Sequence, residues 1–280
     1  MNKTKHKLPT LQEIQEAHVS RWWYEQYLPL NTYIFRPIGF RLTWIAVRMG
    51  LSSEAVSWMS AVVGLAGCVL LLSGSRLTVP VGLALLVVFN LLDCVDGDIA
   101  RCMRTQNPYG RFLDSVCGGV IDLGFWAVVG VMAFRHPELL LWTEPFGYGP
   151  MFWLALGGIT CFLCEILSFL EHRFDELLRP YRESRSEDQA GAEQHHEEIS
   201  ESDPAMLQGR QSAWPLRLIV ATNLRVRETH YFLLVIAYLT SAVDVLLSLY
   251  LTYYLTHSLL LLGVYCIRGR QVRQSYLAHK

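Results

Sequence analysis

Five long stretches of the chain contain almost no charged side chain, and this feature constrains the fold more than any other. The stretches are residues 55–75, 77–92, 115–134, 145–164 and 229–267, and apart from histidines their only ionisable acids or bases are Asp122 and Asp244. A helix that crosses the hydrocarbon core of a bilayer needs about 20 mostly apolar residues. The last stretch is long enough for two such helices, with a turn near residues 244–248. The sequence therefore predicts an all-α integral membrane protein with six transmembrane helices.

The composition agrees with a multi-pass membrane protein that carries one polar insert. Of its 280 residues, 52% are hydrophobic and 18% are charged, and the formal net charge is -1. A chain this close to neutrality has no excess of positive charge for nucleic acid. We therefore expect the membrane, and no nucleic acid, among its partners.

Residues 1–50 are predicted to form an N-terminal amphipathic segment at the membrane surface. Aromatic side chains such as Trp22 alternate there with basic ones such as Arg36, and this mixture favours the headgroup zone. We expect one or two interfacial helices, interrupted at Pro29 and Pro37.

The rest of the chain divides into three regions. Residues 51–171 carry transmembrane helices one to four, with an acidic motif at 93–122. Residues 172–216 form a polar insert on the cytoplasmic side, whose composition is typical of a solvated or disordered loop. Residues 217–280 carry the last two transmembrane helices and a basic tail.

The distribution of basic residues predicts the orientation in the membrane. Arginine and lysine concentrate before the first span, between the second and third spans, and after the last span. With six spans these three segments lie on the same side, and basic flanks mark the cytoplasmic side. Both termini and the acidic motif are therefore expected to face the cytoplasm.

The acidic motif lies at the edge of two apolar segments, where carboxylates are costly and usually functional. Asp93 and Asp96 would share one face of a helix. Gly97 allows a ligand to approach the backbone, and Arg101 can bind two phosphate oxygens at once. The turn signal at 107–109 would bring the next helix alongside.

On that next helix, Gly110 stands at the start and Asp114 one turn further in. The two helix ends could thus direct Asp93, Asp96 and Asp114 at one point. Carboxylate oxygens suit Mg²⁺ or Mn²⁺, and two such ions could neutralise a diphosphate.

The pattern Asp93-x2-Asp96-Gly97-x2-Ala100-Arg101-x8-Gly110-x3-Asp114 resembles the signature of the CDP-alcohol phosphotransferases, also called CDP-alcohol phosphatidyltransferases. The resemblance implies that a CDP-alcohol donates its phospho-alcohol group to the hydroxyl of a lipid or polar alcohol, and that CMP leaves. It implies that Mg²⁺ or Mn²⁺, as two ions, is held by Asp93, Asp96 and Asp114. It further implies a CMP and diphosphate site lined by Gly97, Ala100, Arg101 and Gly110, and a homodimer.

One position departs from that signature. The family motif ends in a fourth aspartate, which acts as a metal ligand and proposed general base, and this chain has Gly118 there. Asp122 lies one helical turn further along, about 6 Å deeper, and is our candidate base. Other carboxylates that could serve are Asp98, Glu165 and Glu228.

Gly118 leaves three interpretations open: a relocated base, an acceptor that is already ionised, or a weakly active or inactive relative. A different class of function is a cation transporter, in which intramembrane carboxylates line an ion path. A transporter would explain the acids, but neither Arg101 nor the eight-residue spacing from Arg101 to Gly110.

Overall fold

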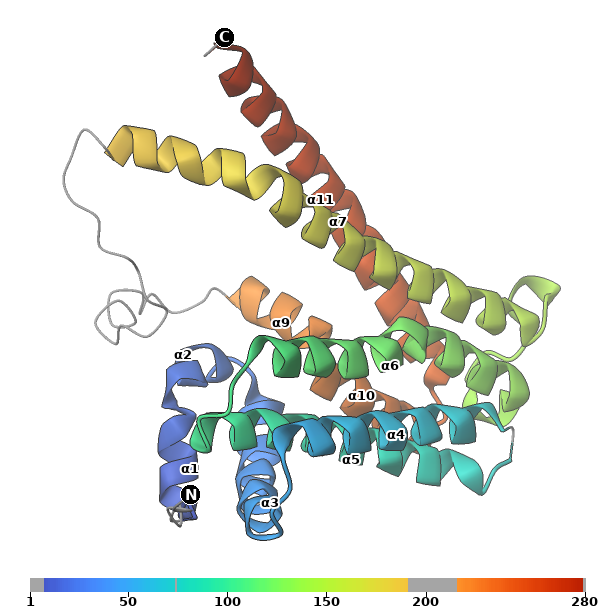
Figure 1. Ribbon diagram of the computed structural model, residues 1–280. Coiled ribbons are helices and arrows are strands. Elements are labelled where there is room, and N and C mark those ends of the chain that lie inside the picture. The colour runs from blue at the N-terminus through green and yellow to red at the C-terminus, as the bar shows by residue number, and fades with distance from the viewer. Residues whose placement is uncertain (1–7, 74, 191–215, 279–280) are drawn as a thin grey trace.

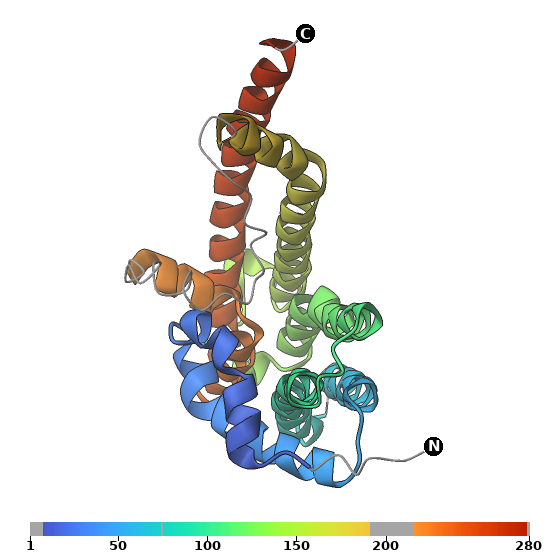
Figure 2. The same cartoon turned by 60° about the vertical axis from the view of Figure 1, so that its left-hand side comes forward.

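The computed structural model describes residues 8–73, 75–190 and 216–278, and these residues form helices and connecting turns without a strand, as expected. Helices α4 (Ser53–Leu72), α5 (Thr78–Cys102) and α6 (Pro108–Arg135) lie side by side (Figure 1). Helices α7 (Met151–Ala190) and α11 (Val243–Ala278) pack along each other and extend away from this group (Figures 1 and 2).

Five helices in the described part of the chain are long and apolar enough to cross a membrane. They comprise Ser53–Leu72, Thr78–Cys102, Pro108–Arg135, Met151–Phe174 and Val243–Gln274. The fold is thus that of a multi-pass membrane protein. The expected sixth span is not among them, because α10 (Arg227–Leu239) has only 13 residues. At 1.5 Å per residue it is about 20 Å long, short of the roughly 30 Å hydrocarbon core.

The turn before α11 lies at residues 240–242, slightly earlier than predicted, with Ser241 in a left-handed conformation (φ 52°). Asp244 is not a turn residue. It lies buried in the first turn of α11, where its carboxylate accepts a hydrogen bond from the backbone N–H of Trp142 at 2.8 Å. This intramembrane acid therefore ties the α6–α7 connection to the start of α11.

The N-terminal segment forms α1 (Leu11–Ala17), α2 (Trp22–Glu25) and α3 (Arg36–Arg48), and α1 and α3 pack against α5 (Figure 1). Pro37 does not interrupt α3 but lies in its first turn. A π-helical turn, Asn31–Phe35, leads directly into α3. Proline removes a backbone donor and crowds the preceding turn, and a wider turn relieves that crowding.

The expected polar insert at 172–216 begins as helix, because α7 continues to Ala190. Its central residues, 191–215, lie outside the described residues. After them, α9 (Leu216–Arg225) leads into α10 through Val226, whose backbone is extended.

Glycines set how closely the helices approach. Where α6 meets α7, a Cβ at Gly157 would lie 2.5 Å from the Cα of Gly130 and 2.8 Å from the carbonyl oxygen of Trp126. Small residues that let helix backbones touch are typical of membrane helix pairs. The contact has no room for a methyl group, since both obstacles are backbone atoms.

We expect Gly157→Ala to lower the thermal stability of the purified protein, because overpacking of this kind typically costs about 1–3 kcal/mol. Gly158→Ala is the matched control, since a Cβ at Gly158 meets nothing within 4 Å. Thermal unfolding in one detergent measures both variants. Equal melting temperatures for the two would contradict the close α6–α7 contact.

Candidate active site

The acidic motif occupies the end of α5 and the start of α6. Helix α5 ends at Cys102, and two residues later Arg104 adopts a left-handed conformation (φ 54°). The N–H of Thr105 then donates to the carbonyl of Ala100 at 2.9 Å, and the N–H of Arg104 donates to that of Arg101 at 3.2 Å. These two bonds form a Schellman cap, which stops the helix and reverses the chain.

Helix α6 begins immediately afterwards. The side chain of Asn107 accepts a hydrogen bond from the N–H of Gly110 at 2.7 Å, and Pro108 occupies the first helical position. Both features are strong helix starts. The chain therefore turns at residues 103–107, slightly earlier than the predicted 107–109, because Pro108 and Tyr109 already belong to α6. This turn sets Asp114 beside the last turns of α5.

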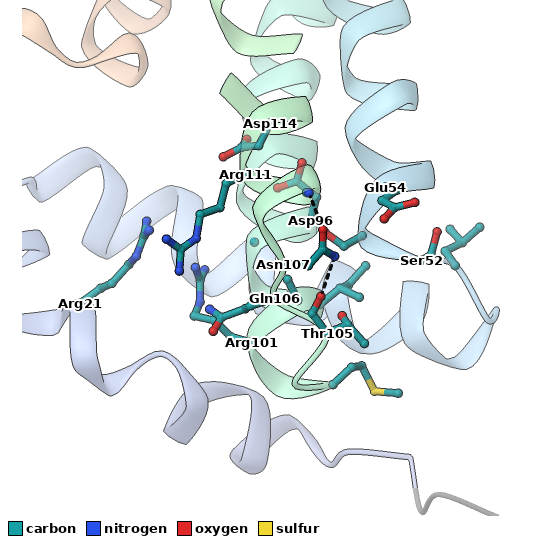
Figure 3. Close-up of a pocket in the computed structure, with 17 residues that line it drawn as sticks. Arg21, Ser52, Glu54, Asp96, Arg101, Thr105, Gln106, Asn107, Arg111 and Asp114 are labelled. Atoms are coloured by element: carbon teal, nitrogen blue, oxygen red, sulfur yellow. Dashed lines mark hydrogen bonds between the residues drawn. The ribbon is translucent and has the colours of Figure 1, made fainter. Parts of the chain in front are cut away.

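A cavity of about 500 Å³ opens at this end of the bundle (Figure 3). Every residue predicted to bind substrate lines it: Gly97, Ala100, Arg101 and Gly110. In Figure 3, Arg21, Arg101 and Arg111 lie on one side of the cavity, and Ser52 and Glu54 of the α4 start lie on the other. The cavity thus has a basic side suited to a phosphorylated ligand.

A second cavity of about 500 Å³ lies next to it and is lined by all three predicted metal ligands, Asp93, Asp96 and Asp114. Asp96 and Asp114 line both cavities. The two spaces therefore meet at these carboxylates. Glu25 and Glu228 also line the second cavity.

The three predicted metal ligands have different partners. Asp96 is 3% exposed and accepts a hydrogen bond from the Ser57 hydroxyl at 2.5 Å. Asp93 forms an ion pair with Nη1 of Arg227 at 2.9 Å. Among the described residues, Asp96 and Asp114 take part in no ion pair. The same residues contain no group of three or more acidic, histidine or cysteine side chains close enough together to hold a metal ion. As hard oxygen donors lining one cavity, the carboxylates nevertheless fit a divalent cation chemically.

Arg227, at the start of α10, fills the space beside Gly118. A Cβ at Gly118 would lie 2.5 Å from Nη2 of Arg227. The same guanidinium donates to Asp122, from Nε at 3.1 and 3.2 Å and from Nη2 at 2.9 Å. It also lies over the Phe89 ring at 4.9 Å. One arginine therefore joins Asp93, Asp122 and the empty motif position.

The alternative carboxylates fall into three places. Asp122 and Glu165 line a separate cavity of about 130 Å³, together with Arg227. Asp98 is 1% exposed and is held inside an ion-pair network. Among these alternatives, Glu228 lines the large cavity that contains the predicted metal ligands.

A buried network below the site was not predicted from the sequence. His18 contacts Glu25 at 2.8 Å and Asp98 at 3.0 Å through its two ring nitrogens. Arg36 donates to both oxygens of Glu25, at 2.6 and 3.0 Å. Arg101 donates to Asp98 at 2.6 Å. The network therefore fixes Arg101 of the motif to the N-terminal segment.

The side chains with shifted pKa values outside the membrane-spanning helices include Arg21, Glu25 and Glu228, which line the two large cavities. Burial, then the positive charges of Arg101 and Arg36, lower the pKa of Arg21. Burial would raise the pKa of Glu25, but the hydrogen bond from His18 and the charge of Arg36 outweigh it and lower that pKa. Burial raises the pKa of Glu228 above its ordinary value. A carboxyl group with a raised pKa in a cavity is a candidate acid–base group.

The family model of the CDP-alcohol phosphatidyltransferases matches residues 43–165. Over this segment the chain is similar to that family. The match spans α4, α5, α6 and the first part of α7, and it includes the whole acidic motif. CDP-alcohol phosphatidyltransferases are transferases, so the match does not favour the cation-transporter alternative. No curated protein matches the chain significantly.

We expect Glu25→Gln to destabilise the protein by about 3–5 kcal/mol, because it leaves the buried Arg36 without its two-oxygen partner. Glu16→Gln is the control, since Glu16 is exposed on α1 and receives one hydrogen bond from Gln12. Unfolding at pH 7 measures the difference.

The difference in stability between wild type and Glu25→Gln should depend on pH, and the lowered pKa of Glu25 fixes the direction. Since the folded pKa of Glu25 is lowered, its contribution is present above the ordinary glutamate pKa of about 4.3 and is lost as pH falls through the folded value. The gap between wild type and Glu25→Gln should therefore narrow on acidification. A gap that is constant down to acid pH would show that the network is not electrostatic.

Proposed function

We propose that this protein transfers a phospho-alcohol group from a CDP-alcohol to an acceptor hydroxyl in the membrane, with release of CMP, as in phospholipid synthesis. The observation that carries the proposal is that all four residues that match the family's nucleotide site, Gly97, Ala100, Arg101 and Gly110, line one cavity, and that the three acids of the motif line the cavity next to it. The two spaces share Asp96 and Asp114, as a donor and an acceptor site must share the reacting centre.

The first cavity is proposed to hold the CDP-alcohol. Gly97, Ala100 and Gly110 keep its wall small, and Arg21 and Arg101 supply positive charge for the diphosphate. Nε of Arg101 supports this assignment, since it is a buried donor for which the described residues provide no acceptor. An unsatisfied buried donor costs about 1–3 kcal/mol, and a phosphate oxygen would relieve that cost.

Asp93, Asp96 and Asp114 are proposed to hold Mg²⁺ or Mn²⁺. Such a cation, when bound, neutralises charge that develops on the diphosphate as the bond to CMP breaks. The protein's own contribution is to hold the carboxylates on two rigid helix ends and to orient Arg101 through Asp98.

The second cavity is proposed to receive the acceptor, a lipid or a polar alcohol. Glu228 is the better placed general base, because it lines this cavity beside the acids. Asp122 remains the base expected from the sequence, but its two oxygens are engaged by Arg227 and it lines the smaller cavity. We therefore propose that Glu228 accepts the proton from the acceptor hydroxyl and that Asp122 holds Arg227.

The setting in the cell is also a proposal. The arginine-rich segments before α4 and between α5 and α6 support an N-terminus and an active site that face the cytoplasm. The expectation that the C-terminus lies on the same side required six spans, and five membrane-length helices do not provide for it. Homodimerisation is proposed from the family resemblance alone.

We predict Mg²⁺- or Mn²⁺-dependent release of CMP when the purified protein is given a CDP-alcohol and an acceptor. Alanine at Asp93, Asp96 or Asp114 should abolish release. Glu138→Ala is the control, since Glu138 is a surface acid in the connection after α6, and it should keep full activity. A panel of donors and acceptors that yields neither CMP release nor CDP binding would refute the proposed function.

The identity of the base can be read from pH–rate profiles of Glu228→Gln and Asp122→Asn. Loss of general-base help typically costs 10²–10⁴-fold. We expect Glu228→Gln to lose that much and to lose the rise of the rate with pH, whereas Asp122→Asn keeps that rise. The reverse pattern would assign the base to Asp122.

A further inference from the structure

The position of Arg227 beside Gly118 explains why the fourth carboxylate of the motif is missing. The glycine is buried, and its absent side chain would point directly at the guanidinium, 2.5 Å from Nη2. The space that a carboxylate would need is therefore filled by a cation of the protein itself.

The guanidinium is held firmly in this place. It has two hydrogen-bonded contacts to one oxygen and a third to the other oxygen of Asp122, and it pairs with Asp93 through Nη1. The Phe89 ring lies against it, and only 20% of the side chain is exposed. Arginine keeps its charge at any physiological pH, so this cation is permanent.

The glycine at 118 and the guanidinium beside it both make the net charge at the motif more positive. Relative to a site with a carboxylate at position 118 and no guanidinium, this site lacks one negative charge and gains one positive charge. The difference equals the charge of one divalent cation. Asp96 and Asp114, which line both cavities and have no ion pair among the described residues, remain as the acids open to an external cation.

We propose that Arg227 takes the place of one of the two divalent cations, so that this chain binds one divalent ion, at Asp96 and Asp114. Asp93 is shared between that ion and Arg227. The inference rests on the proposed function, and it assigns Gly118 a positive role: the glycine makes room for the arginine. The chain is then an active variant of the site rather than a damaged one.

The test is the number of Mn²⁺ ions bound per chain, measured by electron paramagnetic resonance of free Mn²⁺ during titration of the purified full-length protein. Wild type is expected to bind one. Gly118→Asp is also expected to bind one, because Arg227 would pair with the new carboxylate. The double variant Gly118→Asp with Arg227→Gln has four motif carboxylates and no guanidinium, and it is expected to bind two.

The matched control is Gly118→Asp with Arg225→Gln, which is expected to bind one. Arg225 lies two residues before Arg227 and pairs with Glu171, away from the motif. CMP binding by each variant, followed by fluorescence of a labelled nucleotide, verifies that the site is folded.

Each outcome decides the inference. A count other than one for wild type overturns it, as does a count of two for Gly118→Asp alone or of one for a folded double variant. Since Mn²⁺ counting needs no turnover, its result is separate from that of the CMP-release assay. CMP release with two bound ions would refute the role of Arg227 and leave the proposed function intact.

Discussion

Carboxylates at the ends of apolar helices are stable only if something neutralises them, and this requirement organises the whole site. Asp98 is neutralised by Arg101 and Arg36 and hydrogen-bonds His18, which brings the N-terminal segment onto α5. Asp93 and Asp122 are neutralised by Arg227, which joins α10 to α5 and α6. Asp96 accepts a hydrogen bond from the Ser57 hydroxyl and has no ion-pair partner among the described residues. The internal pairs thus fix the fold around the acids that the protein leaves for a ligand.

The local features of the site could be predicted because they depend on neighbours in the sequence. The apolar stretches predicted all five membrane-length helices, and the turn signal at Asn107 predicted the start of α6. These two inferences need only helical periodicity and turn chemistry. The family resemblance implied a common nucleotide site for Gly97, Arg101 and Gly110, and these three residues line one cavity.

The long-range features could not be predicted in this way. His18 and Asp98 are 80 residues apart, and Asp122 and Arg227 are 105 apart. Arg227 stands just before an apolar stretch, where basic residues are common, so the sequence gives no sign of its ion pairs with Asp93 and Asp122. The sixth membrane span, expected from residues 229–267, is missing for a related reason. Apolar composition continues through the whole stretch, whereas the chain turns at 240–242 and leaves α10 too short to cross. Such features could be predicted only from pairs of positions considered together, such as the glycine at 118 and the arginine at 227.

The segment that matches the family and the segments that flank it line different parts of the site. Residues 43–165 contain the motif and most of the lining of the first cavity. The second cavity draws Glu25, Asn31 and Arg36 from before the match, and Glu228 from after it. Chemistry on the CDP group needs the same carboxylates and arginine whatever the acceptor, and these lie inside the match. Under the proposed function, the choice of acceptor would depend on contacts with the other substrate, and the flanking segments line the cavity proposed for it. Arg227 belongs to the same C-terminal flank, so one segment both adjusts the charge of the reacting centre and lines the space where the acceptor would bind.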